Sequence, residues 1–242
     1  LLLAVVLPVI GGHATGRDLA WGAVCGVAGA FAIGMLYRGL AVGTMGIVSP
    51  LSAVLGASIP MVYGLAFRGE RPGWLAYAGI AAALLAVVCV SVSERALEAH
   101  EPARGARAGL FPPGVREGLL AGVGFGVYFI ALAQTRADAG MYPLLAARVT
   151  SIVLLLGGGI VFGGVRAVLV ARPALTIVIG CGLLDMGANV LFVLAAHRGM
   201  LAIVAVLTSL YPAATVALAA IVLRERLGRI QWVGVTLALG GA

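Results

Sequence analysis

The chain has 242 residues, of which 62% are hydrophobic and only 10% are charged. Soluble globular domains are about 45–50% apolar and about 25% charged, so this composition excludes a water-soluble domain. The net charge of +7 comes from arginines that stand singly or in small groups between apolar runs. Because no basic stripe follows a helix face, we expect a lipid bilayer as partner and no nucleic acid.

Nine apolar segments follow one another when the chain is divided at its charges and prolines. Seven of them approach the roughly 20 residues that a helix needs to cross a hydrocarbon core about 30 Å thick. The segments are 1–12, 19–36, 45–67, 72–92, 118–135, 141–162, 174–196, 200–223 and 230–242. We expect the short first and last segments to be helices trimmed at both ends of a longer protein. The predicted fold class is an all-α, multi-pass membrane protein, a polytopic helical bundle.

One long polar connection, from Ser93 to Arg116, separates four segments from five. The two groups resemble each other, because a shift of 155 places Glu70 on Glu225 and Gly79 on Gly234. Charged residues that recur at equivalent turns are hard to attribute to chance in a chain rich in Gly, Ala and Leu. The pattern therefore predicts an internal repeat.

The repeat predicts a division into 1–92, a linker at 93–116, and 117–242. Each repeat holds five spans if a helix missing from the N-terminus is added to the first. An odd number of crossings makes the second repeat enter the membrane from the opposite side, as is typical of secondary transporters. Their substrate sites lie near the bilayer midplane where the repeats meet. Duplication for packing alone, as in a scaffold, is the alternative.

The second half also carries a motif: Pro212 within a segment, Glu225 at the following turn, and Gly234 nine residues later. Glu70 and Gly79 repeat the Glu and the Gly of this motif. The motif resembles the end of an EamA-type domain, which is found in transporters of the drug/metabolite transporter superfamily. The resemblance covers essentially the whole chain. It implies two inverted five-helix repeats, ten helices at full length, and transport without a defined substrate.

Polar side chains inside membrane spans are costly and are therefore functional candidates. Asp185 and Asn189 are four residues apart in segment 174–196, so they share one helix face near the bilayer centre. We expect Asp185 to be protonated, or ionised only when water or a cation reaches it, because few countercharges are at hand. Arg148 in segment 141–162 is expected to extend to the membrane interface instead. Substrate contact, proton binding and a structural clamp between helices all stay open for Asp185.

Other candidates for a substrate pathway lie beside a broken helix or on a neighbouring segment. Pro212 frees the carbonyl of the residue four positions earlier, next to several hydroxyl groups. We expect segments 118–135, 174–196 and 200–223 to line a shared polar cavity, although a packing kink and interfacial placement are alternatives. The pathway candidates are Asp185, Asn189, Thr208, Ser209, Tyr211, Tyr128 and Gln134.

The remaining conspicuous residues favour structural roles. Glu70 and Glu225 have Arg neighbours at turns and, with Gly79 and Gly234, are interpreted as turn anchors of the repeats. Glycines at 118, 122 and 126 recur every four residues, a spacing that lets helices approach closely in lipid. The sequence shows no paired carboxylates, no Ser/His/Asp arrangement and no Cys/His metal spacing. We therefore expect no enzyme, no metal and no cofactor.

The predicted function is a secondary transporter or exporter of small metabolites, amino-acid-like or drug-like, that works by alternating access. The expected location is the inner (plasma) membrane of a bacterial cell, with a small-molecule substrate as partner and homo-oligomer formation left open. The alternatives are a membrane-embedded lipid-handling protein and a non-transporting scaffold. The arginine distribution places the 93–116 loop in the cytoplasm, whereas the family resemblance places it outside.

Overall fold

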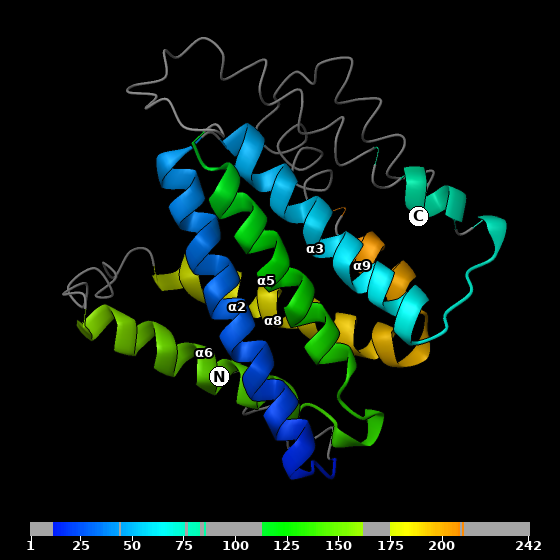
Figure 1. Ribbon diagram of the computed structural model, residues 1–242. Helices are drawn as coiled ribbons and strands as arrows, with labels where there is room; N and C mark the ends of the chain where they lie inside the picture. Colours follow the sequence, from blue (N-terminus) through cyan, green and yellow to red (C-terminus); the bar gives the residue numbers. More distant parts are fainter. Residues whose placement is uncertain are drawn as a thin grey trace. The chain divides into compact units, whose positions relative to one another are not determined.

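The computed structural model describes residues 12–43, 45–75, 77–82, 85, 113–161, 175–208 and 210. All regular secondary structure within these residues is helical, without a strand among them. The helices are α2 (Gly16–Val42), α3 (Met45–Phe67), α5 (Val115–Ala133), the 3-10 helix η1 (Ala137–Ala139), α6 (Tyr142–Val161), α8 (Leu175–Arg198) and α9 (Leu201–Thr208), as Figure 1 shows.

Four described helices are long and apolar enough to cross a membrane: Gly16–Val42, Val115–Ala133, Tyr142–Val161 and Thr176–Arg198. They correspond to predicted segments, and α3 has the bounds predicted for segment 45–67. The prediction of an all-helical, multi-pass membrane protein is therefore confirmed. Segment 1–12 apart from Gly12, segment 230–242, and most of the linker at 93–116 lie outside the described residues.

The chain divides into two compact units that do not follow its linear order. Unit 1 comprises Leu1–Ala30 and Ile130–Gly199, and unit 2 comprises Phe31–Phe129 and Met200–Ala242. Each unit thus takes residues from both halves of the sequence. The division into repeats at 1–92 and 117–242 concerns internal similarity and stays a prediction.

In unit 2, α5 packs closely along α3 through its ladder of glycines. A Cβ atom added at Gly118 would lie 3.2 Å from the carbonyl oxygen of Val48, and one at Gly122 would lie 2.6 Å from the Cβ of Leu55. A Cβ at Gly126 would approach Ile59 to 2.7 Å. The contacts advance in the same direction along both helices, so α3 and α5 run parallel. The packing role predicted for this ladder is confirmed.

Also in unit 2, α9 lies beside α3 (Figure 1). Val206 is buried in a small apolar cluster to which Met61 contributes. A Cβ added at Gly64 would lie 3.3 Å from the backbone nitrogen of Ala202. Later residues of α3 therefore meet earlier residues of α9, and the two helices run in opposite directions. In an inverted repeat, the equivalent segments 45–67 and 200–223 must run in opposite directions. The repeat itself stays a prediction.

In unit 1, the first half of α2 packs against the beginning of α6. Cβ atoms added at Gly22 and Gly26 would collide with the carbonyl oxygens of Pro143 and Ala147. The buried side chains of α8 lie from the middle of that helix onward and are Met186, Phe192, Val193 and Ala196. The first half of α8 is largely exposed in the described structure.

Candidate functional site

The charged side chains of α6 and α8 meet within unit 1. A guanidinium nitrogen of Arg148 donates a hydrogen bond to Oδ2 of Asp185 and forms an ion pair with it. The Asp185 side chain is 58% exposed and that of Arg148 is 32% exposed. Asp185 is the eleventh residue of the 24-residue helix α8, so this pair lies near the middle of a candidate membrane span.

The pair corrects two expectations about these residues. Arg148 does not extend away to the interface, and Asp185 does not lack a countercharge. The physical reason is that α6 brings its seventh residue beside the middle of α8, where pairing neutralises both charges. Pairing of opposite charges is the usual way in which proteins keep ionised groups within a membrane.

Asn189 extends this polar cluster by one helical turn. Its Nδ2 donates to the backbone carbonyl of Asp185 at 2.7 Å and lies 3.4 Å from Oδ1 of the same residue. The predicted sharing of one helix face by Asp185 and Asn189 is therefore observed. Arg148 offers a planar set of hydrogen-bond donors, whereas Asp185 offers a carboxylate, so the cluster presents both signs of charge.

The other predicted pathway residues that the structure describes belong to both units. The Thr208 hydroxyl donates to the carbonyl of Val204 in its own helix at 2.7 Å. Tyr128, in unit 2, packs edge-on against Phe129 with ring centroids 5.4 Å apart. Gln134, in unit 1, is half-buried in the turn after α5.

Several predictions cannot be compared with the described structure. Ser209, Tyr211, Glu225 and Gly234 lie outside the described residues. The shared cavity of segments 118–135, 174–196 and 200–223 stays a prediction. Among the residues that the structure describes, no group of three His, Cys, Asp or Glu side chains is placed to hold a metal ion.

The turn residue Glu70 makes a long-range contact within unit 2. Its Oε1 accepts a hydrogen bond from the backbone N–H of Leu201, and its Oε2 accepts one from Ala202, both at 2.9 Å. Arg68 lies beside it, with its Nε 3.9 Å from Oε1. Gly79, the other residue predicted to anchor a turn in the first half, is half-buried and lies within a helical stretch instead of a turn, so that prediction is wrong. Glu70 thus caps the first turn of α9.

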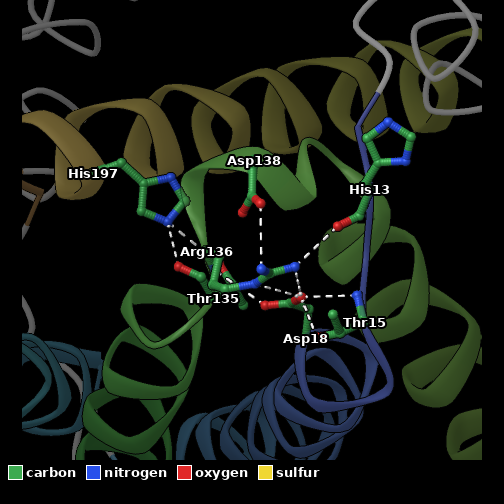
Figure 2. A network of polar contacts seen from close by, with 7 residues as sticks. All are labelled: His13, Thr15, Asp18, Thr135, Arg136, Asp138 and His197. Carbon is green, nitrogen blue, oxygen red and sulfur yellow. Dashed lines mark hydrogen bonds and ion pairs between the residues drawn. The ribbon is translucent and has the colours of Figure 1, made fainter.

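A polar network that the sequence reading missed joins three parts of unit 1 (Figure 2). The buried carboxylate of Asp18 accepts hydrogen bonds from the N–H and the hydroxyl of Thr15 at 2.9 and 2.6 Å. Arg136 donates to the same carboxylate from its backbone N–H and its Nε at 3.1 and 3.2 Å. The Arg136 guanidinium also contacts Asp138 at 3.3 Å.

The loop that contains Thr135 and Arg136 also contacts α8. Nε2 of His197 lies 2.7 Å from the carbonyl oxygen of Thr135 and therefore donates to it (Figure 2). Arg136 in turn donates to the carbonyl of His13 at 3.1 Å. The start of α2, the loop before α6 and the end of α8 are thus joined by hydrogen bonds that involve side chains.

One sequence signal could have revealed the start of this network. Thr15 and Asp18 have the spacing of a capping box, in which the third helical residue binds the backbone N–H of the cap. As a charged residue, however, Asp18 also bounds the predicted apolar segment 19–36, which corresponds to α2. The helix in fact begins at Gly16 and ends at Val42.

Comparisons with known proteins bear on this arrangement. Five solved protein chains match, and one of them, described only as a crystal structure of a protein, is 16% identical with a TM-score of 0.54. That match covers 94% of this chain and 86% of the other, and at this identity it shows the fold alone. No curated protein matches the chain significantly.

The family comparison is more specific. The model of the EamA-like transporter family matches residues 113–242, which make up more than half of the chain. The matched region begins just before the second predicted repeat at 117–242. Together with the apolar helices, the match confirms the EamA-type resemblance. The chain belongs to the EamA-like transporter family, and is therefore a membrane transporter of the drug/metabolite transporter superfamily.

Proposed function

We propose that this protein is a secondary transporter that moves small amino-acid-like or drug-like metabolites across the inner membrane by alternating access. The observation that carries the proposal is the pairing of Arg148 with Asp185 between two helices that are long and apolar enough to cross a membrane. Family membership supports transport in general, and the charged pair supports a polar substrate.

Ionised groups within a membrane span cost free energy, on the order of 2.5–3.5 kcal/mol each on insertion scales. A helix pair that only needed stability would be served as well by apolar side chains. An exposed ion pair can also bind substrate. Each of the two side chains can release its partner and bind a group of opposite charge on the substrate instead. Arg148 suits a carboxylate, whereas Asp185 and Asn189 suit an ammonium or another hydrogen-bond donor.

Proton coupling fits the same cluster. Alternating access would expose the Asp185 carboxyl group to water on each side of the membrane in turn, and a carboxyl group exposed in this way can carry a proton between the two sides. A pH gradient would then bias the direction of transport.

The proposal is tested with the purified chain reconstituted in proteoliposomes, with and without a pH gradient. The probes are radiolabelled neutral, acidic and basic amino acids and the drug-like cation ethidium. We expect Asp185→Asn to abolish gradient-dependent transport and Arg148→Gln to reduce transport at least about tenfold, as loss of a charged hydrogen bond predicts. Glu117→Gln serves as a control, because Glu117 pairs with Arg38 at 3.9 Å and belongs to unit 2, whereas the Arg148–Asp185 cluster belongs to unit 1.

The double variant Arg148→Gln with Asp185→Asn separates stability from transport. It leaves no uncompensated charge, so we expect its thermal stability in detergent to exceed that of either single variant while transport stays lost. Unchanged gradient-driven transport in Asp185→Asn would show that the carboxyl group is only structural. Transfer of fluorescent phospholipid between leaflets, without transport of any probe, would favour the lipid-handling alternative.

A further inference from the structure

We propose that Glu70 is a positioning residue for transport, which holds the beginning of α9 and thereby sets the position of the helix that carries Thr208. Its part in transport rests on the function proposed above, whereas its contact with α9 does not. Glu70 itself touches backbone rather than substrate.

Both carboxylate oxygens of Glu70 are engaged by the first turn of α9. Oε1 accepts from the N–H of Leu201 and Oε2 accepts from that of Ala202, each at 2.9 Å. The side chain is only 11% exposed. These N–H groups have no partner within their own helix. A negative charge at this end is also favoured by the helix dipole.

The residues around Glu70 are shaped to present this carboxylate. After α3 ends at Phe67, Gly69 adopts φ of 64°, a left-handed conformation that glycine adopts without strain. This turn lets the N–H of Glu70 donate to the carbonyl of Gly64 at 3.1 Å. A Cβ on Gly64 would lie 2.6 Å from Oε2 of Glu70, so a larger residue there would require the carboxylate to shift.

The cap is unusual because it comes from a distant part of the chain. Helix N-termini are normally capped by the Ser, Thr, Asp or Asn that directly precedes them. Gly199 and Met200 precede α9, and neither has an oxygen in its side chain. Glu70 supplies the cap from 131 positions away, in the other predicted repeat.

The cap therefore links the end of α3 to the beginning of α9. When α9 moves relative to α3, Glu70 must either move with it or release two charge-assisted hydrogen bonds. Arg68, at 3.9 Å, is the nearby cation that remains with the carboxylate if it is released. Such a link affects how fast α9 changes position more than how tightly substrate binds.

The contact is tested by hydrogen exchange of the chain in lipid nanodiscs, measured by mass spectrometry on peptides that cover 199–208. We expect Glu70→Ala to accelerate exchange in the first turn of α9 about tenfold, the size expected for loss of a helix cap. Glu70→Gln should have a smaller effect, because one amide oxygen still accepts. Glu117→Gln should leave this region unchanged.

Transport is then measured with whichever probe amino acid the wild type transports fastest. We expect Glu70→Ala to lower kcat about tenfold while KM stays within about twofold, because the lost cap alters helix movement and not substrate contact. Gly64→Ala should reproduce this split although it keeps the carboxylate. Gly34→Ala is the matched control, because a Cβ at Gly34 meets no atom of the described part of the chain within 4 Å.

The outcomes are distinguishable. Unchanged exchange in Glu70→Ala would overturn the contact itself. Faster exchange with unchanged kcat in Glu70→Ala would show that Glu70 caps α9, but it would overturn the role of Glu70 in transport. A wild type that transports no probe would overturn the proposed function and this role in it, while the exchange result would still decide whether Glu70 holds α9.

Discussion

The glycines of this protein form two groups with opposite surroundings. In the packed group, which includes Gly22, Gly26, Gly118, Gly122 and Gly126, an added Cβ would lie within about 3.2 Å of another helix. In the open group, an added Cβ would meet no atom of the described residues within 4 Å; on α6 and α8 it comprises Gly157, Gly158, Gly159, Gly180, Gly182 and Gly187. The same residue type thus serves close helix contact in one region and leaves a helix face uncovered in the other.

The open glycines of α6 and α8 lie on the two helices that carry the charged pair. Gly182 and Gly187 lie on either side of Asp185 on α8, and the glycines of α6 follow Arg148 by about three turns. The region that carries the charges is therefore also a region of sparse packing. Elements that move during function are generally drawn from such weakly packed regions.

Cysteine labelling gives the largest expected contrast between the packed and open regions. Cys25 lies between Gly22 and Gly26 and is fully buried, whereas Cys181 lies between two open glycines and is exposed. Cys181 is also four residues before Asp185, on the same helix face. In single-cysteine variants in vesicles, we expect a membrane-impermeant thiosulfonate to label Cys181 and to leave Cys25 unlabelled.

This experiment also distinguishes water from lipid beside α8. Thiols react as thiolates, which require water nearby. If Cys181 reacted only after solubilisation in detergent, its helix face would be covered by lipid in the membrane. That result would contradict the proposed pathway at Asp185.

Substitution of one glycine from each group should change stability in opposite directions. Gly122→Ala forces Leu55 and the backbone of α3 aside and should lower the free energy of unfolding by about 1–3 kcal/mol. Gly187→Ala has open space and should raise it by up to about 1 kcal/mol through better helix propensity. Unfolding in mixed detergent, followed by circular dichroism, measures both. Equal effects would mean that the two groups do not differ in packing.

The smallest predicted contrast concerns the network at the start of α2. Asp18→Asn removes a charge from a buried group that accepts from Thr15 and Arg136, so we expect a lower melting temperature. Asp138→Asn alters a side chain that is 62% exposed and should change melting little, as for other exposed ion pairs. A larger loss for Asp138→Asn than for Asp18→Asn would contradict the role given to Asp18.

Much of the fold could be predicted from the lengths of apolar runs. Segment 45–67 matched α3 because its ends coincide with turns rather than with charges inside a helix. The prediction of 19–36 for α2 was too short at both ends, since Asp18 is satisfied by its cap and Arg38 pairs with Glu117. A charge ends an apolar run in sequence, but it ends a helix only when the backbone turns there.

The candidate site was only partly predictable. Asp185 and Asn189 share a face because of their spacing, which depends only on helix geometry. The partner of Asp185 is 37 positions away, and finding it required knowledge that α6 lies beside α8. The target of Glu70 was equally hidden, because two backbone N–H groups of α9 leave no signature in side-chain chemistry.

The ion pairs at the two ends of α2 have a consequence for the bilayer itself. Asp18 and Arg38 are twenty residues apart, which in a helix is about 30 Å, the thickness of a typical hydrocarbon core. A thicker bilayer would draw these charges into hydrocarbon, and a thinner one would expose apolar residues to water, at fractions of a kcal/mol per Å. The length of the lipid acyl chains sets the bilayer thickness, and α2 fits one such thickness. Transport activity should therefore be greatest in bilayers whose hydrocarbon core is about as thick as the distance between Asp18 and Arg38.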